Sequence, residues 1–297
     1  MNNRLRNLDL GKIVLFISHF FQNVELLELL SNSTNNNLSY KMRLDQKDCV
    51  LKIYSHGNKR KILQSIQLQN FLYARGFPCQ SIITPANNLL LEDEGRYYSL
   101  FEFVHGESMP VRAITADYAF QILDVLKLFY KLTKNYSGDI DKKNPRVPPF
   151  ENGLYNAKFE EMLERYKSIF ELRDGMDALI HGDFQFNHVL KSPEGKIFLL
   201  DFESVRTGSS LEDLANFIFY FHCTKYNQTA SPREFFNYFI DKDNFRSSDI
   251  KNLNNYVRMV SLRYGLGSIW EFNRSFIDER ELNKRLKAVN RSDNLEL

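Results

Sequence analysis

The sequence predicts an α+β fold of two lobes, a sheet with one helix followed by a mainly helical region. Three observations support this fold class. Short apolar runs of strand length fill Val24 to Tyr54, helix-spaced apolar residues fill Lys59 to Arg75, and helical periodicity dominates after His105. A chain of 297 residues exceeds one compact core of ordinary size, so two lobes, or one large domain with insertions, can both bury a core.

The first lobe is predicted to be residues 1–105, with a hinge near residues 101–105. Its strands are expected to form a five-stranded antiparallel sheet, and they span residues 24–30, 38–44, 49–54, 81–92 and 96–104. The helix over 59–75 stops at Gly76 and Pro78, which do not continue helices. An apolar run at Ile13 to Phe21 predicts an amphipathic helix packed on this lobe.

The second lobe is predicted to be residues 106–297. Its helices are expected at 113–132, at 156–172 and from Ser209, where a capping box precedes an apolar run, to about Val289. Between them a hairpin-like pair over 188–203 turns at Ser192 to Gly195. The lobe is therefore mainly helical.

The composition indicates which kinds of partner and which cellular compartment to expect. The chain is 43% apolar and 26% charged with a net charge of +2, and its dispersed Lys and Arg residues predict no nucleic-acid partner. Three cysteines in no CxxC spacing favour a reducing cytoplasm over a disulfide framework. The run at Ile13 to Phe21 is too short to span a bilayer and lacks a cleavage site, so we expect neither a membrane partner nor a signal peptide.

The segment "LIHGDFQFNHVL", residues 179–190, carries the chemistry-bearing residues. Asp183 is followed by two adjacent polar side chains, Asn187 and His188, and the next strand ends at Asp201 in "LLDFE". Phosphoryl transfer needs such a set, because one carboxylate orients the attacking hydroxyl and other groups hold the metal that bridges the nucleotide phosphates.

These strings, together with "DLA" at Asp213 to Ala215, resemble the aminoglycoside phosphotransferase and choline kinase superfamily, relatives of the protein kinases. The resemblance implies a protein-kinase-like fold with Asp183 as the catalytic residue. The family's metal ligands correspond to His188, five residues after Asp183, and to Asp201. A His there is similar to the catalytic loops of aminoglycoside 2''-phosphotransferases and macrolide kinases.

The implied metal is Mg²⁺, with Mn²⁺ as the alternative because Mg²⁺ prefers oxygen to imidazole nitrogen. Three roles stay open for His188: it binds the metal, it bonds a metal-bound water, or it only ties the loop together. His181 is interpreted as a structural residue that bonds the loop backbone.

The resemblance extends to nucleotide-binding residues. Lys52 in "VLKIY" is expected to contact the α- and β-phosphates, and Asn37 follows the turn that covers them. That turn contains no glycine, so its backbone approaches phosphate less freely. Backbone groups near Glu102 to Val104 are expected to bind the purine of ATP or GTP, and Gln185 is expected to reach the transferred phosphate.

One departure from the family pattern concerns the partner of Lys52. The family places a Glu in the following helix, but no acidic residue occurs between Lys52 and Glu92. Three alternatives remain. Gln64 or Gln67, which flank the expected position, orients Lys52; or Lys52 pairs elsewhere, perhaps with Asp201; or the nucleotide site is degraded.

The predicted function is a small-molecule kinase that moves the γ-phosphate of ATP or GTP to a hydroxyl of an antibiotic, sugar or amino alcohol. The alternative is a non-catalytic, pseudokinase-like nucleotide-binding or scaffold protein. Residues 106–297 hold 27 Lys and Arg against 28 Asp and Glu. This balance favours a small neutral or partly anionic substrate at least as much as a polycation. We expect a monomer or a weak dimer.

Overall fold

The computed structural model describes residues 9–32, 37–54, 58–140, 155–171, 178–224, 227–240 and 247–295. The chain divides into two compact units. The first contains Met1–Gly106, Tyr136–Ile140 and Ser192–Glu203, and the second contains Glu107–Asn135, Asp141–Lys191 and Ser204–Leu297. Asp201 therefore belongs to the first unit, although it lies in the sequence beyond the predicted boundary at residue 105.

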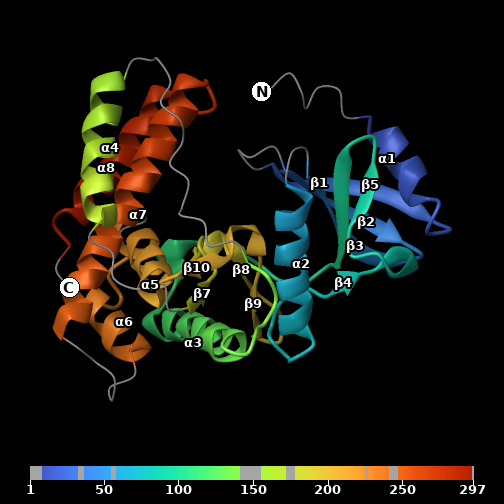
Figure 1. The fold of residues 1–297 in the computed structure, drawn as a ribbon, viewed down its shortest axis with the longest axis horizontal. Coiled ribbons are helices and arrows are strands. Elements are labelled where there is room, and N and C mark those ends of the chain that lie inside the picture. The colour runs from blue at the N-terminus through green and yellow to red at the C-terminus, as the bar shows by residue number, and fades with distance from the viewer. Residues whose placement is uncertain are drawn as a thin grey trace. The chain divides into compact units, whose positions relative to one another are not determined.

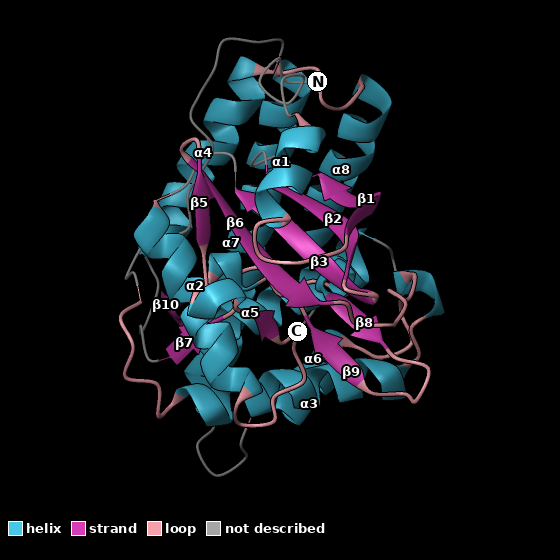
Figure 2. Ribbon diagram, turned by 90° about the vertical axis from the view of Figure 1, so that its right-hand side faces the viewer, coloured by secondary structure: helices cyan, strands magenta, loops and turns pink. Residues whose placement is uncertain are grey.

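The first unit is built on an antiparallel sheet (Figures 1 and 2). Its strand order is β1-β2-β3-β6-β4, and β5 also pairs with β6. The strands are β1 (Val24–Asn32), β2 (Asn37–Leu44), β3 (Lys47–Tyr54), β4 (Ile82–Ile83), β5 (Leu91–Asp93) and β6 (Arg96–Glu102). The predicted α+β class and the antiparallel sheet are confirmed, with six short strands in place of five.

The additional strand arises because the apolar run over 81–92 is broken in the middle. Pro85 begins a single 3₁₀ turn there, and Ala86 and Asn87 adopt left-handed φ values of 47° and 64°. Proline has no N–H to donate to a ladder, and left-handed residues do not continue a strand. The run therefore yields two short strands, each paired with β6.

Two helices accompany this sheet. Helix α1 (Leu10–Ile17) is capped by Asp9, and its residues Ile13 and Ile17 are buried with sheet residues such as Leu51. Helix α2 (Lys59–Tyr73) follows β3 and is capped by Asn58, in agreement with the predicted helix over 59–75. In β3, Leu51 and Ile53 lie on one face of the strand and are buried in the core. Successive side chains of a strand point to opposite faces, so Lys52 lies on the other face.

The second unit is mainly helical, as predicted (Figure 1). Its helices are α3 (Ala116–Thr133), α4 (Asn156–Glu171), α5 (Ser210–Ile218), α6 (Pro232–Phe239), α7 (Ser247–Asn273) and α8 (Glu279–Ser292). The remaining strands among the described residues are β7 (Ala178–Ile180), β8 (Val189–Lys191), β9 (Ile197–Leu199) and β10 (Arg206–Gly208), of which β9 belongs to the first unit. Helix α7 packs against α4, α5 and α8, and β10 pairs antiparallel with β7.

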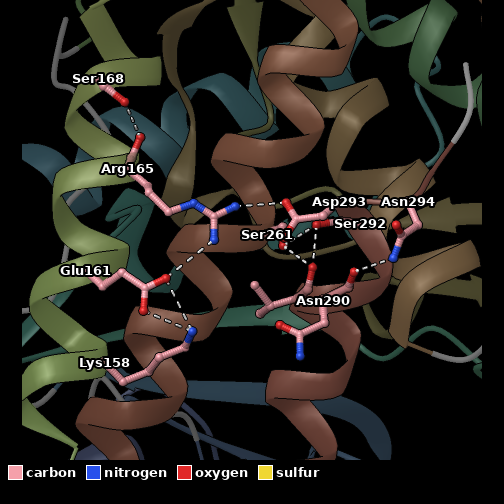
Figure 3. Close-up of polar contacts among 10 residues, drawn as sticks. Lys158, Glu161, Arg165, Ser168, Ser261, Asn290, Ser292, Asp293 and Asn294 are labelled. Carbon is pink, nitrogen blue, oxygen red and sulfur yellow. Dashed lines mark hydrogen bonds and ion pairs between the residues drawn. The ribbon is translucent and has the colours of Figure 1, made fainter.

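Polar contacts join α4, α7 and α8 (Figure 3). Arg165 of α4 donates to Asp293, which follows α8, at 2.9 Å. Ser292 donates to Ser261 of α7 at 2.6 Å, and both hydroxyls are buried. The C-terminal end of α8 is therefore fixed to the interior turns of α4 and α7 by directional bonds. None of the described helices combines the length and the apolar character that crossing a membrane requires.

Candidate active site

The loop that carries Asp183 follows β7 and is fixed to the buried side chain of Asp213, near the start of α5. The backbone N–H groups of His181 and Gly182 donate to the two carboxylate oxygens of Asp213 at 2.7 and 2.8 Å. The Tyr130 hydroxyl of α3 donates to the same carboxylate at 2.7 Å. Burial raises the pKa of Asp213, and the hydrogen bonds that it accepts oppose part of that rise.

Glycine is the only residue type that fits position 182, directly before Asp183. Its φ of +79° lies in the left-handed region, and a Cβ there would lie 2.3 Å from the backbone oxygen of Ser204. The loop thus turns sharply directly before Asp183. His181 is fully buried within 6.5 Å of the Phe129 and Phe184 ring centroids, which agrees with its interpretation as a structural residue.

The Asp183 carboxylate is 36% exposed and is held by a neighbour in the loop. The Gln185 side-chain amide donates to both carboxylate oxygens at 3.1 Å. Gln185, which was predicted to reach the transferred phosphate, is therefore engaged with the Asp183 carboxylate in this structure. This contact restricts the rotation of the carboxylate while leaving it accessible.

His188 and Asn187 differ in how they lie in the loop. The His188 Nδ1 atom is 2.9 Å from the backbone oxygen of Asp183, so Nδ1 carries the proton and donates it. In the neutral imidazole with this tautomer Nε2 keeps its lone pair, which is the form in which an imidazole can bind a metal. The Asn187 side chain is exposed. This geometry suits the predicted ligand role of His188 and equally shows that His188 ties the loop together.

Two residues of the second unit that the sequence reasoning did not select lie within electrostatic range of Asp183. Tyr220 is in a π-helical turn, Phe219–Thr224, and its pKa is raised by burial and then by the Asp183 carboxylate. Burial lowers the pKa of Arg263, but Glu212 and, to a smaller extent, Asp183 raise it more. Single π-helical turns are often found at functional sites, which is the one local signal for Tyr220.

In the first unit, Lys52 lies between two carboxylates. Its ammonium is 2.9 Å from Asp201 Oδ1 and also forms an ion pair with Glu203. The Asn37 amide donates to Glu203 Oε2 at 2.7 Å. Burial lowers the pKa of Lys52, but Asp201 and Glu203 raise it more, so Lys52 is charged at neutral pH. The structure thus brings together the predicted residues Lys52, Asn37 and Asp201 and adds Glu203.

These contacts decide among the alternatives for the partner of Lys52. The two glutamines of α2 were one alternative. Gln67 is exposed and Gln64 is buried, and the polar contacts of Lys52 within the described residues are with Asp201 and Glu203. Ser65, between the two glutamines, donates to the backbone oxygen of Ile62 at 2.8 Å. The pairing with Asp201 is therefore confirmed as the arrangement in this structure.

The residues present fit a divalent cation that keeps most of its water ligands. Within the described ranges no group of three or more His, Cys, Asp or Glu side chains could enclose a metal. Mg²⁺ commonly uses one or two carboxylates together with substrate phosphates. Asp201, with a side chain that is 36% exposed and a left-handed φ of 63°, offers a carboxylate suited to that role.

The predicted hinge uses some of its backbone groups within the protein. The Glu102 N–H donates to the backbone oxygen of Ser81, and the Glu102 oxygen accepts from the Gln80 side chain at 3.1 Å. Val104, two residues further on, lies outside β6 and is partly exposed. A purine that bonds to the Glu102 carbonyl would use the second lone pair of its oxygen. The purine contacts expected at Glu102 and Val104 stay predictions.

The fold and these residues define the class of protein: a two-lobed, protein-kinase-like phosphotransferase. The model of the phosphotransferase enzyme family (APH) matches residues 29–246. The chain belongs to this family and is a small-molecule phosphotransferase. No curated protein matches the sequence at a significant level.

Solved structures of small-molecule kinases are similar in fold. One is an amicoumacin kinase in complex with AMP-PNP, Ca²⁺ and Ami, at 12% identity and a TM-score of 0.76, covering 99% of this chain and 96% of that one. A microcompartment-associated aminopropanol kinase shares 12% identity with a TM-score of 0.68, covering 95% of each chain. The choline kinase LicA from Streptococcus pneumoniae shares 16% identity with a TM-score of 0.63, covering 96% and 98%.

Proposed function

We propose that this phosphotransferase transfers the γ-phosphate of ATP or GTP to a hydroxyl of a small molecule, with Asp183 as the catalytic residue. The observation that carries the proposal is the Asp183 loop: its backbone is fixed by buried Asp213, and its carboxylate is held by Gln185 and remains accessible. A carboxylate so placed can orient an attacking hydroxyl and accept its proton.

The nucleotide is assigned to the first-unit residues on chemical grounds. Lys52 steadies the α- and β-phosphates, since it is charged and only 16% exposed. Asn37 lies beside it, and the backbone at Glu102 and Val104 is assigned to the purine. The AMP-PNP in the amicoumacin kinase complex supports a purine nucleotide as co-substrate.

A divalent metal, Mg²⁺ with Mn²⁺ as the alternative, is assigned to Asp201 and His188. When bound, it would neutralise charge on the transferring phosphate. Asp201 contributes a hard oxygen donor, and the His188 tautomer leaves Nε2 as a donor. The Ca²⁺ in the amicoumacin kinase complex supports a divalent cation.

For the acceptor we propose a small neutral or partly anionic hydroxyl compound. A polycation would need unpaired carboxylates around Asp183. In the described part of the second unit, Glu212 is instead shared by two guanidinium groups, those of Arg206 and Arg263. Arg285 likewise forms ion pairs with Glu271 and Glu281, at 2.8 and 3.0 Å. Arg263 is within electrostatic range of Asp183, and this guanidinium is more compatible with an anionic substituent than with an amino group.

The test is a titration of ATP and GTP, each with and without Mg²⁺ or Mn²⁺, read as thermal stability. A ligand that binds only the native state stabilises it by about 2.7 kcal/mol at a hundred times its Kd. We expect a metal-dependent rise in Tm with at least one purine nucleotide. No shift with any combination would contradict the proposal and favour the non-catalytic scaffold.

A further inference from the structure

A single short segment supplies both carboxylates that contact Lys52. Asp201 and Glu203 are two residues apart, and the Lys52 ammonium contacts each of them. The Lys52 side chain is 16% exposed and that of Glu203 is 28% exposed. Partly buried charge pairs are screened less by solvent than surface pairs, so these contacts restrict the position of the ammonium.

Glu203 is itself fixed by a neighbouring strand. One of its carboxylate oxygens, Oε1, contacts Lys52 in β3, and the other, Oε2, accepts the Asn37 amide at 2.7 Å. Asn37 begins β2, which pairs with β3 so that Ser39 lies opposite Lys52. The Glu203 side chain therefore spans two adjacent strands, and both of its oxygens are engaged.

Helix α2 offers no carboxylate for this purpose. Protein kinases orient the equivalent lysine with a glutamate from a helix, yet no acidic residue follows Lys52 until Glu92. Two of the polar residues buried on α2 bond elsewhere: Ser65 donates to Ile62, and the Gln69 amide donates to the backbone oxygen of Gln80 at 2.8 Å.

We propose that Glu203 is the positioning residue for Lys52, replacing a helix carboxylate, and that Asn37 holds Glu203 in place. This inference rests on the proposed function. Since two carboxylates share one lysine, Glu203 keeps the ammonium in position when Asp201 turns toward a metal. The orientation of Lys52 then depends on β2 and on the segment after β9, and not on a carboxylate of α2.

The test measures the Kd for ATP by titration, first in excess chelator and then with Mg²⁺, for the wild type and for Glu203→Gln. The substitution keeps the shape and removes the charge. We expect the Kd to rise about tenfold in both conditions, because Lys52 loses one of its two charge-assisted contacts. In a Lys52→Met background the same change is expected to have no further effect, since Glu203 acts through Lys52.

The matched control is Glu92→Gln. It also removes a Glu from an ion pair with a lysine, here Lys59 at 2.6 Å, but that pair is on the surface of the same unit. We expect it to leave the Kd unchanged. Asn37→Ala is the second variant: by releasing Glu203 it is expected to raise the Kd about threefold without removing a charge, less than Glu203→Gln because Lys52 keeps both of its carboxylates.

Three results would overturn the inference. One is an unchanged Kd in Glu203→Gln with wild-type binding intact. Another is a defect seen only with Mg²⁺ and relieved by more Mg²⁺, which would make Glu203 a metal ligand. The third is an equal loss of affinity when Glu203→Gln is added to Lys52→Met. A wild-type chain that bound no nucleotide would overturn this inference and the proposed function together, whereas the first three outcomes leave the proposed function standing.

Discussion

The Lys52 group of the first unit and the Asp183 loop of the second are held by different kinds of contact. Lys52 is positioned by ion pairs between side chains, and its partner Asp201 lies 149 positions away in the sequence. The Asp183 loop is positioned by backbone N–H groups that donate to one buried carboxylate. The first arrangement can be altered by a ligand that competes for a carboxylate, whereas the second is a fixed part of the core.

The largest expected effect tests the Asp183 loop. Asp183→Asn should reduce turnover about a thousandfold or more, because the amide cannot accept the proton of the hydroxyl. The loop backbone does not depend on the Asp183 carboxylate, so nucleotide affinity should stay nearly intact. Steady-state kinetics together with a nucleotide titration would check this. An equal loss of turnover and affinity would argue against a catalytic role.

The second effect tests the Lys52 group. Lys52→Met should reduce nucleotide affinity and turnover together, by roughly a hundredfold in kcat/KM, since the cation that we propose contacts the phosphates is lost. Lys59→Met, which breaks an exposed pair with Glu92 in the same unit, is the control. If Lys52→Met affected only turnover, the proposed phosphate contact would be wrong.

A third prediction concerns the buried support of the Asp183 loop. Asp213→Ala leaves the N–H groups of His181 and Gly182 and the Tyr130 hydroxyl without their acceptor. We expect the free energy of unfolding to fall by roughly 4 kcal/mol, measured by urea denaturation. Glu203→Gln should cost much less, because its partners are partly exposed. Similar losses in both variants would remove the distinction between the two regions.

A fourth prediction uses pH to probe the helical core beside the loop. Burial lowers the pKa of His222 from 6.5 to about 4. The folded state therefore keeps His222 neutral while the unfolded chain takes up a proton below pH 6.5, so stability is lost as pH falls from 6.5 toward 4. The contribution reaches roughly 3 kcal/mol. His222→Gln should show a shallower loss over that range in urea titrations; an identical slope would contradict the assignment.

The smallest effects separate the two polar neighbours in the loop. His188→Asn should preserve or improve the use of Mg²⁺, because an amide oxygen suits that ion better than imidazole. Asn187→Ala should be mild, since the Asn187 side chain is exposed. Activity against Mg²⁺ and Mn²⁺ concentration would measure both. A severe defect in Asn187→Ala would show that the ligand was assigned to the wrong residue.

Local patterns made much of this molecule predictable. The strands of the first unit and helix α2 follow apolar periodicity, and the string around Asp183 has a fixed spacing. The contacts that complete the site are long-range. The fold decides which segments come together. It brings Glu203 to Lys52, and it brings Asp213 to the backbone N–H groups of His181 and Gly182. Glu203 ends the "LLDFE" string that carries the family resemblance, but that string does not indicate which side chain Glu203 contacts.

The catalytic role of Asp183 is tested most directly by an assay of phosphoryl transfer. The wild-type chain would be incubated with ATP or GTP, Mg²⁺ or Mn²⁺ and a panel of neutral, anionic and polycationic hydroxyl compounds, with the released nucleoside diphosphate as readout and Asp183→Asn as the matched control. We predict release that requires one of the neutral or anionic acceptors and is abolished in Asp183→Asn. Acceptor-dependent release that persists in Asp183→Asn would contradict the central claim.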